Sequence, residues 1–506
     1  MRRAASSSPG AGERCGRRRT CRKGHRPASR WPFWGPERHP ADGARGRSPV
    51  GECAAPAVTR TYETADECQY SSAVGRASAT GSVRRRTFRD ARRPCAAMLR
   101  AGDAETRHAD LPDPRRRMTP AFINPVFDAL PTTVFETMSR LARVHGAINL
   151  GQGFPDDPGP ADVRERGARA LLDGWNQYPP MMGLPALREA VAAHYARHQG
   201  LDLDPETEVM VTSGATEALA GALLALIEPG DEVVLFAPMY DAYLPLVRRA
   251  GGVPRIVPLR PPAFRLDEAA LAQAFGARTR VVVLNNPLNP SATLFAPEDL
   301  DLLARYCQRF DVTALCDEVW EHVVFDGARH RPLMALPGMR ERTVKIGSAG
   351  KIFSLTGWKV GFVMAEARLM RGLAKAHQFL TFTTPPNLQE AVAYGLGKPA
   401  PWFEAMRAGY ARSRDRLADG LRGLGFTVLP AQATWFLNVD VAALGHTDDV
   451  AFCEALVTRH GVAAIPVSAF YPDASVRGLV RLCFAKDDAT LDAALDRMRG
   501  LPGAAA

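Results

Sequence analysis

The sequence of 506 residues contains no run of about 18 consecutive apolar residues, the length that a membrane-spanning helix requires. A membrane partner is therefore not expected. The sequence also lacks cysteines with the spacing of a metal site, and no metal is expected. Four of its nine cysteines follow residue 117 and stand in apolar contexts, as buried free thiols do: Cys307, Cys316, Cys453 and Cys483. Free thiols are typical of a reducing compartment, so the expected location is the cytoplasm.

Lysine is almost absent from the first 117 residues, where Lys23 stands alone among many arginines. This segment holds 26 Lys+Arg against 12 Asp+Glu, whereas residues 118–506 hold 38 against 42. The net charge of +10 therefore belongs to the N-terminal segment. Because its Arg, Ser, Ala, Pro and Gly follow no helical or strand period, residues 1–117 are predicted to be a disordered basic extension.

Three interpretations of this extension compete. Its arginine clusters at 17–19 and 84–86 would attract nucleic-acid phosphates. Its Arg and Ser content suits a transit peptide, although its acidic residues weaken that interpretation. We favour the third, in which the segment is upstream sequence translated from a start placed too early and Met118 is the true beginning. Compact periodic sequence begins directly after Met118, so 1–117 is expected to lie outside the native fold and a nucleic-acid partner is not expected.

After residue 118 the chain alternates buried strands with helices, which predicts an α/β protein with a mainly parallel, three-layer sheet domain. Beyond about residue 400 the pattern changes to that of an α+β domain. The expected division is an N-terminal arm with a small-domain segment at 118–165, a large domain at 166–397 and a small C-terminal domain at 398–506. Strands are predicted at 209–212 and in VVLFAP, VVVLN, VTALC and LVRLCFA, and helices at 161–173, 217–227, 297–310, 366–380, 401–424 and 450–461.

The stretch VKIGSAGKIFSLTGWKVGFVM, residues 344–364, is the one around which the rest is organised. Lysines usually lie on the surface, but Lys351 stands between a glycine and the apolar Ile352. An amine in such a pocket has its pKa lowered by desolvation and is able to form a Schiff base with a carbonyl. Ser348 and Lys359 offer a hydroxyl and a cation on either side, which together suit a phosphate. Pyridoxal phosphate requires an imine-forming lysine beside such a phosphate site.

Three other stretches carry charges or small residues where ligands bind in α/β sheets. SGAT, at 213–216, joins a strand to a helix N-terminus, which attracts anions, although such turns are common. Asp317 follows the apolar TALC and should be buried, so it needs a cationic partner; a protonated pyridine nitrogen and a local arginine are both candidates. Arg481 stands in an apolar strand, where its guanidinium suits either a bidentate substrate carboxylate or an internal ion pair.

These residues resemble the pyridoxal-phosphate-dependent aminotransferases of class I/II, and within them the kynurenine/glutamine-K and methionine aminotransferase branch. The likeness runs from about Thr119 to Met498, and the prefix 1–117 has no counterpart. The motifs occur in the family's order: NLGQGFPD, NQYPPMMG, TSGATEAL, NNPLNPS, DEVWEHVVFDG, SAGKIFSLTGWKVG and VRLCFAKDD. The resemblance implies the fold-type-I architecture of aspartate aminotransferase, an aminotransferase activity and a homodimer.

The resemblance also implies how the cofactor is bound. Lys351 would be the Schiff-base lysine and proton carrier, Asp317 would keep the ring nitrogen protonated, and Asn289 would bond the ring hydroxyl. Tyr240 would stack on the ring. The phosphate would be held by a larger group: Ala215, Thr216, Ser348, Lys359 and, from the partner subunit, Tyr178.

For the substrate, the resemblance implies that Arg481 binds the α-carboxylate with help from Asn289, while Gly153 and Phe135 border the side-chain pocket. Phe382 is a further expected pocket aromatic. One residue departs from the family pattern, because Trp320 stands where a tyrosine is usual. The phenol bond to the ring hydroxyl is then missing, unless the indole N–H replaces it.

Two other functions use a similar domain. A β-lyase that eliminates from cysteine or its S-conjugates has the same site and differs only in its products, ammonia and pyruvate. A pyridoxal-phosphate-binding transcription regulator would carry a helical DNA-reading module upstream, and 1–117 shows none. No second arginine stands in a motif that could hold a side-chain carboxylate, so the expected donors are uncharged, aromatic or sulfur-containing amino acids. The motifs do not distinguish kynurenine, methionine, glutamine and succinyl-diaminopimelate.

Overall fold

A computed structural model of the chain describes residues 122–499 and 501, which belong to one compact unit. The predicted disorder of 1–117 lies outside the described residues. Within them no helix is long and apolar enough to cross a membrane.

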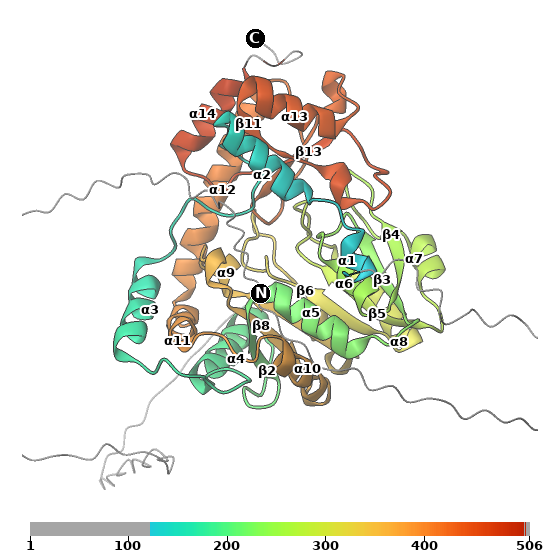
Figure 1. Ribbon diagram of the computed structural model, residues 1–506, viewed down its shortest axis with the longest axis vertical. Helices are drawn as coiled ribbons and strands as arrows, with labels where there is room; N and C mark the ends of the chain where they lie inside the picture. Colours follow the sequence, from blue (N-terminus) through green and yellow to red (C-terminus); the bar gives the residue numbers. More distant parts are fainter. Residues whose placement is uncertain (1–121, 500, 502–506) are drawn as a thin grey trace, which may run out of the picture. The chain divides into compact units, whose positions relative to one another are not determined.

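The central sheet has seven strands in the order β2-β8-β7-β6-β5-β3-β4 (Figure 1). It is mainly parallel, as predicted, because β8 alone runs opposite to the other six strands. Its strands are β2 Val209–Thr212, β3 Glu232–Ala237, β4 Val253–Pro258, β5 Thr279–Asn285, β6 Thr313–Asp317, β7 Thr343–Ser348 and β8 Gly361–Ala365.

Helices cover both faces of this sheet. Met210 of β2 belongs to a hydrophobic cluster with residues of α5 (Gly214–Leu226) and α10 (Ala367–Leu380). The adjacent Val209 and Val211 belong to a second cluster, with residues of α4 (Pro185–Gln199) and α11 (Pro386–Leu396). Because successive strand side chains point to opposite faces, the two helix pairs lie on opposite sides. The fold therefore has the three layers that the alternating sequence predicts.

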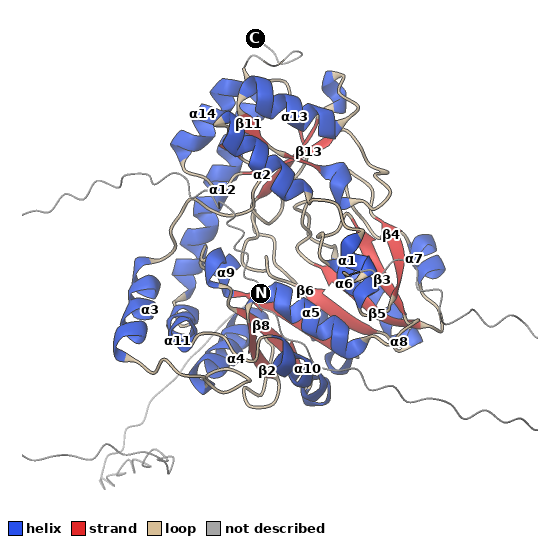
Figure 2. Cartoon of the chain, viewed as in Figure 1, coloured by secondary structure: helices blue, strands red, loops and turns tan. Residues whose placement is uncertain are grey.

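A second, antiparallel sheet has the order β12-β13-β10-β9, and a parallel pair joins β1 to β11 (Figure 2). The long helix α12 contacts β9, β10 and α14, while α2 contacts α13 and β11. The strands are β1 Ile148–Asn149, β9 Thr427–Val428, β10 Phe436–Asp440, β11 Val462–Ala463, β12 Ile465–Pro466 and β13 Leu479–Cys483. The helices are α2 Val134–His145, α12 Ala400–Gly423, α13 Asp449–His460 and α14 Asp488–Met498.

The remaining α-helices of the described residues are α1 Pro125–Asp128, α3 Ala161–Asp173, α6 Tyr243–Arg249, α7 Glu268–Ala274, α8 Pro297–Phe310 and α9 Ala349–Ile352. The bounds of α3, α8 and β2 agree with the prediction. Helix α5 begins three residues earlier than predicted, because SGAT forms its first turn and the Ser213 amide donates to Glu217 Oε2 at 3.1 Å. The proposed domain boundaries at 165 and 397 stay a prediction.

Candidate active site

A cavity of about 220 Å³ lies at the carboxyl ends of three neighbouring parallel strands. Asn285 ends β5, Asp317 ends β6 and Ser348 ends β7, and all three line the cavity. This edge of a parallel sheet is where ligands bind. The other lining residues are Gly214, Ala215, Thr216, Leu219, Tyr240, Asn289, Val319, Trp320, Gly350, Lys351, Thr356 and Lys359. All the predicted cofactor-binding residues except Tyr178 are therefore brought together here.

Asp317 presents an unpaired carboxylate oxygen in this cavity. Its Oδ2 accepts a hydrogen bond from the Tyr243 phenol at 2.5 Å, while its buried Oδ1 has no partner among the described residues. Burial raises the pKa of Asp317, and the hydrogen bond from Tyr243 acts against that rise. A buried carboxylate oxygen without a partner is costly, so Oδ1 is suited to accept a hydrogen bond from a ligand N–H.

Lys351 lies on α9, the short helix that follows β7. Its Nζ is 3.5 Å from the Gly153 carbonyl and lies 4.6 Å and 5.0 Å from the ring centroids of Trp320 and Trp435. Burial lowers the pKa of this amine to about 8, so roughly a tenth of it is neutral at pH 7, far more than of an exposed lysine. A neutral amine can attack a carbonyl or accept a proton, as the sequence predicts.

The amino end of α5 and Lys359 form a place for an anion. The first amides of a helix have no partner within it, and here they belong to the small residues of SGAT. The Lys359 side chain lies against Gly214, where an added Cβ would be 3.2 Å from its Nζ. Ser348 and Thr216 line the same cavity. Free amides, an ammonium group and hydroxyls together suit a phosphate.

Arg481 of β13 is buried and reaches the residues that border the cavity. Its Nη1 donates to Asn289 Oδ1 and its Nη2 to the Gly151 carbonyl, each at 2.8 Å, while its Nε has no partner. Its guanidinium carbon lies 3.9 Å from the centroid of the Phe436 ring. Burial lowers the pKa of Arg481 to about 9, and no carboxylate among the described residues forms an ion pair with it. The predicted alternative of an internal ion pair is therefore not what the structure contains.

The predicted side-chain pocket residues lie beside this arginine. The Phe135 ring lies 5.3 Å from the guanidinium carbon and packs edge-on against Phe470. Gly153 approaches Phe436 so closely that an added Cβ would lie 2.6 Å from the phenyl ring. Only glycine fits there, which explains the residue type found in the motif.

Trp320, which replaces the usual tyrosine, is buried and packs edge-on against Trp435 with ring centroids 4.8 Å apart. Its ring also contacts Phe436 at 5.5 Å. The indole therefore belongs to an aromatic wall beside Lys351.

Tyr178 and Phe382 are predicted site residues that do not line the cavity of this chain. Their rings pack edge-on with centroids 5.6 Å apart, and Tyr178 is 80% exposed. The assignment of Tyr178 to the site of a second copy and of Phe382 to the side-chain pocket stays a prediction.

Sequence reasoning missed Tyr243, which lies in the same aromatic segment as Tyr240 (PMYDAY), and Trp435, which lies in a strand-like segment. The one sequence signal for Tyr243 is its place three residues after the expected stacking tyrosine, and that place does not show that it reaches Asp317. The partners of Arg481 on the Gly151 side were also missed, since a backbone carbonyl leaves no mark on the sequence.

Residues 145–498 match the family model described as aminotransferase class I and II. The chain belongs to this family. The resemblance expected from the motifs and the α/β fold class are thereby confirmed, and the chain is an enzyme of the transaminase type.

Curated aminotransferases match over most of their length. A probable N-succinyldiaminopimelate aminotransferase of Mycobacterium tuberculosis is 45% identical over 378 residues, which cover 72% of this chain and 95% of that relative. The methionine aminotransferase of Escherichia coli is 43% identical over 372 residues, covering 74% and 96%. Human kynurenine–oxoglutarate transaminase 1 is 36% identical over 394 residues, covering 71% and 93%.

Solved aminotransferase structures have the same fold. The M. tuberculosis N-succinyldiaminopimelate aminotransferase superimposes with a TM-score of 0.73 at 45% identity, covering 74% of this chain and 99% of that one. An E. coli structure with a methionine aminotransferase function also gives 0.73 at 42% identity, covering 76% and 100%. These aminotransferases differ in the substrates that their names give, so the substrate of this chain has to be argued from its own residues.

Proposed function

We propose that this aminotransferase uses pyridoxal 5′-phosphate and moves the amino group of an uncharged, aromatic or sulfur-containing L-amino acid to a 2-oxo acid. The observation that supports the cofactor best is the unpaired, buried Oδ1 of Asp317 at the end of β6. A protonated pyridine nitrogen is a donor of the right charge for it.

The other lining groups fit the same cofactor. The α5 amides of Ala215 and Thr216, with Ser348 and Lys359, would hold its phosphate, and Lys351 would hold its aldehyde covalently. Tyr240 would stack on its ring and Asn289 would bond its hydroxyl.

When bound, the cofactor supplies an electron sink that stabilises negative charge at the substrate Cα. The residues of this chain supply the rest. Arg481 would bind the substrate carboxylate, Asp317 would keep the ring nitrogen protonated, and Lys351 would take and return the Cα proton as general base. The pKa of Lys351, about 8, is suited to accepting and returning a proton.

The preference for uncharged donors is supported by the charges around the cavity. Its only cationic lining residues among the described ones are Lys351 and Lys359, and both have roles in holding the cofactor. Arg481 is used by the α-carboxylate, and Phe135, Phe436 and Trp320 supply apolar surface near it. No arginine lines the cavity among the described residues, so no second guanidinium is available there for a side-chain carboxylate.

We also propose a homodimer in which Tyr178 reaches the phosphate of the second copy. Tyr178 and Trp175, 80% and 70% exposed, offer the apolar surface that such an interface would bury. Sedimentation of the wild type tests the dimer. Tyr178→Ala should still sediment as a dimer, while its cofactor Kd, measured by absorbance titration, should be higher than that of the wild type.

The function is tested by presenting the full chain, loaded with cofactor, with a panel of amino donors and 2-oxo acids. Methionine, phenylalanine, kynurenine and glutamine should give a new amino acid with higher kcat/KM than aspartate. A best kcat/KM with aspartate or N-succinyldiaminopimelate would contradict the proposed preference. Release of ammonia and pyruvate from cysteine S-conjugates, without a new amino acid, would instead identify a β-lyase that uses the same residues.

A further inference from the structure

One segment of backbone contacts three cationic side chains at or near the site. We call residues 151–156 the strap. The Gly151 carbonyl accepts a hydrogen bond from Arg481 at 2.8 Å, the Gly153 carbonyl lies 3.5 Å from Lys351 Nζ, and the Phe154 carbonyl accepts one from Lys486 at 3.1 Å. Arg481 and Lys351 have roles in the proposed reaction, but Lys486 has none.

The ammonium group of Lys486 contacts the strap at two residues. Besides the Phe154 carbonyl, its Nζ contacts Asp156 Oδ1 at 2.8 Å and lies 4.7 Å from the centroid of the Phe154 ring. The Lys486 side chain is only 5% exposed. Charge-assisted bonds of a buried ammonium hold their partners more firmly than an exposed pair does.

The strap depends on Lys486 in its second half, because the first half has bonds of its own: the Gln152 amide donates to Asn149 Oδ1 at 3.2 Å and the Gln152 side chain donates to the Ser139 hydroxyl. At its ends, the Gly151 amide donates to Asn149 at 2.9 Å and the Asp156 amide to the Ala485 carbonyl at 3.2 Å. The bond from Lys351 to Gly153 is long, and Lys351 has to move during the proposed reaction. Among the described residues, Lys486 is then the one cation bonded to the second half of the strap.

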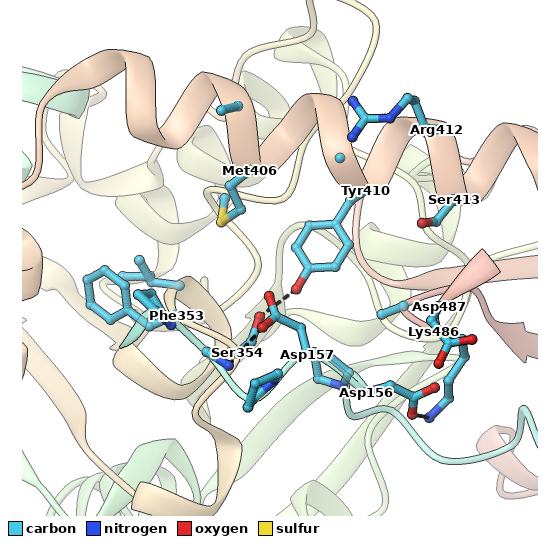
Figure 3. A pocket seen from close by; sticks show the side chains of 18 of the residues that line it. Asp156, Asp157, Phe353, Ser354, Met406, Tyr410, Arg412, Ser413, Lys486 and Asp487 are labelled. Carbon is cyan, nitrogen blue, oxygen red and sulfur yellow. Dashed lines mark hydrogen bonds and ion pairs between the residues drawn. The ribbon is translucent and has the colours of Figure 1, made fainter. Parts of the chain in front are cut away.

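On one side, Pro155 and Asp156 of the strap are not covered by packed side chains. They border a cavity of about 680 Å³ that lies between the segment 155–160 and α12 (Figure 3). Figure 3 shows Lys486 bonded to Asp156 at one end of this cavity and Tyr410 bonded to Ser354 at another. With open space on that side, the ion pair rather than packing fixes where the strap lies.

Movement of the strap would change the orientation of Arg481, which is proposed to bind the substrate carboxylate. Gly153 has no free space against Phe436, whose ring lies under the guanidinium of Arg481. We propose, on the basis of the function proposed above, that Lys486 is a positioning residue. It holds the strap so that Gly151 and Phe436 keep Arg481 oriented for the α-carboxylate of amino and oxo acids.

The test compares Lys486→Met, Lys486→Arg and wild type as full chains loaded with cofactor. Lys486→Met should raise the KM of amino donors and of 2-oxo acids about tenfold, with kcat changed by no more than about twofold. The Kd of an unreactive carboxylate such as 3-phenylpropionate, followed by cofactor absorbance, should rise equally. Lys486→Arg keeps the charge and should restore most of the affinity.

Lys398→Met is the matched control, because Lys398 also pairs with an aspartate, Asp162, but makes no contact with the strap. It should leave both KM values and the carboxylate Kd unchanged. Unchanged values in Lys486→Met would overturn the proposal, and so would a loss of kcat, cofactor affinity and thermal stability together, which would indicate a merely structural role.

Hydrogen exchange separates this proposal from the proposed function. The amides of residues 151–156 should exchange faster in Lys486→Met than in wild type or Lys398→Met. If they do not, Lys486 does not position the strap, whatever the turnover. If they do, but wild type transfers no amino group and binds no carboxylate, it is the proposed function that fails.

Discussion

The phenol of Tyr243 donates to one oxygen of Asp317 at 2.5 Å and leaves the other oxygen without a partner. Because both side chains are buried, this bond selects the oxygen that remains for a ligand. It also acts against the rise in the pKa of Asp317 that burial causes. Tyr243, which does not line the cavity, therefore helps to keep Asp317 ionised.

Tyr243→Phe should weaken cofactor binding. Without the phenol the pKa of Asp317 rises further, so the carboxylate is less ionised and holds a protonated ring nitrogen less well. We expect the Kd of pyridoxal phosphate to rise about tenfold, measured by absorbance titration at pH 7. Tyr471→Phe is the control, since that buried phenol donates to the Leu259 carbonyl at 2.7 Å, away from the cavity. Equal affinities for Tyr243→Phe and wild type would show that the bond is not needed.

Lys351→Ala should still bind the cofactor through Asp317 and the α5 amides. It should lose the absorbance of the lysine-bound cofactor and at least about a thousandfold in rate, because both the covalent attachment and the general base are gone. Lys359→Ala, only eight residues away, should show the reverse pattern, with the absorbance kept and the cofactor Kd raised. Substantial turnover by Lys351→Ala would exclude this lysine as the catalytic one.

Arg481→Lys should lower kcat/KM for every donor by about a hundredfold, because an ammonium group cannot bind a carboxylate in a bidentate manner or stack on Phe436. Steady-state kinetics with methionine and phenylalanine measure this. Arg414→Lys is the control, since Arg414 also makes two bonds to one carboxylate, that of Asp326, at 2.6 and 2.9 Å. That change should reduce stability and leave KM unaltered. Equal kinetic losses in both variants would argue against a carboxylate site at Arg481.

Trp320→Tyr should lower the pKa of the cofactor-bound lysine nitrogen. A phenol would donate to the ring oxygen and stabilise its anion, which is worth roughly 0.5–1.5 kcal/mol, or about 0.4–1.1 pKa units. The indole ring beside Lys351 also favours the protonated nitrogen more than a phenol does, so both effects act in one direction. Spectrophotometric pH titration measures the shift. Trp402→Tyr, which lies outside the cavity beside Lys351, should show none. An unchanged pKa in Trp320→Tyr would mean that the indole N–H already replaces the phenol.

Lys345→Met should reverse the acid dependence of stability. Lys345 is fully buried and bonded to both Glu318 and Glu321. Burial alone would raise the pKa of Glu318, but Lys345 and His330 bring it down to about 2. This ionised pair therefore contributes stability above pH 4.5, and the contribution is lost as the pH falls toward 2.

In the variant Glu318 and Glu321 lose the buried ammonium group, so we expect a loss of about 3–5 kcal/mol at pH 7 and a smaller loss at pH 5, where Glu318, whose pKa Lys345 no longer lowers, takes up a proton more readily. Urea unfolding at the two pH values measures this. Arg422→Met, which removes an exposed pair with Asp419, should cost less than about 1 kcal/mol at both. A loss in Lys345→Met that grows on acidification would contradict the expected ionisation.

The sequence predicts those parts of the site that follow from local position. Asp317 and Ser348 each end an apolar strand, and Lys351 follows in the next turn, so period and strand length suffice to place them at one sheet edge. The edge strand β4 was not predicted, because it is largely exposed and contains Pro254 and Pro258, which break the apolar pattern.

Contacts across the fold are beyond such reasoning. Tyr243 is separated from Asp317 by 74 residues, and Lys486 from Phe154 by 332. Nothing in the spacing of either pair shows that they meet. The carboxylate position at Arg481 was predicted from one buried charge in an apolar strand, but its stacking on Phe436 depends on the antiparallel pairing of β10 with β13.

The side chains of the segment 317–322 point in two directions, one set into the cavity and the other into the core. Asp317, Val319 and Trp320 line the cavity, whereas Glu318 and Glu321 enter the buried ion pair with Lys345. This short turn thus divides its positions between anchoring the chain and facing the cavity. In a saturation library selected for folding alone, positions 318 and 321 should accept few residues, because a replacement removes a partner from the buried Lys345. Positions 319 and 320 are buried as well, so they should accept mainly apolar residues of similar size.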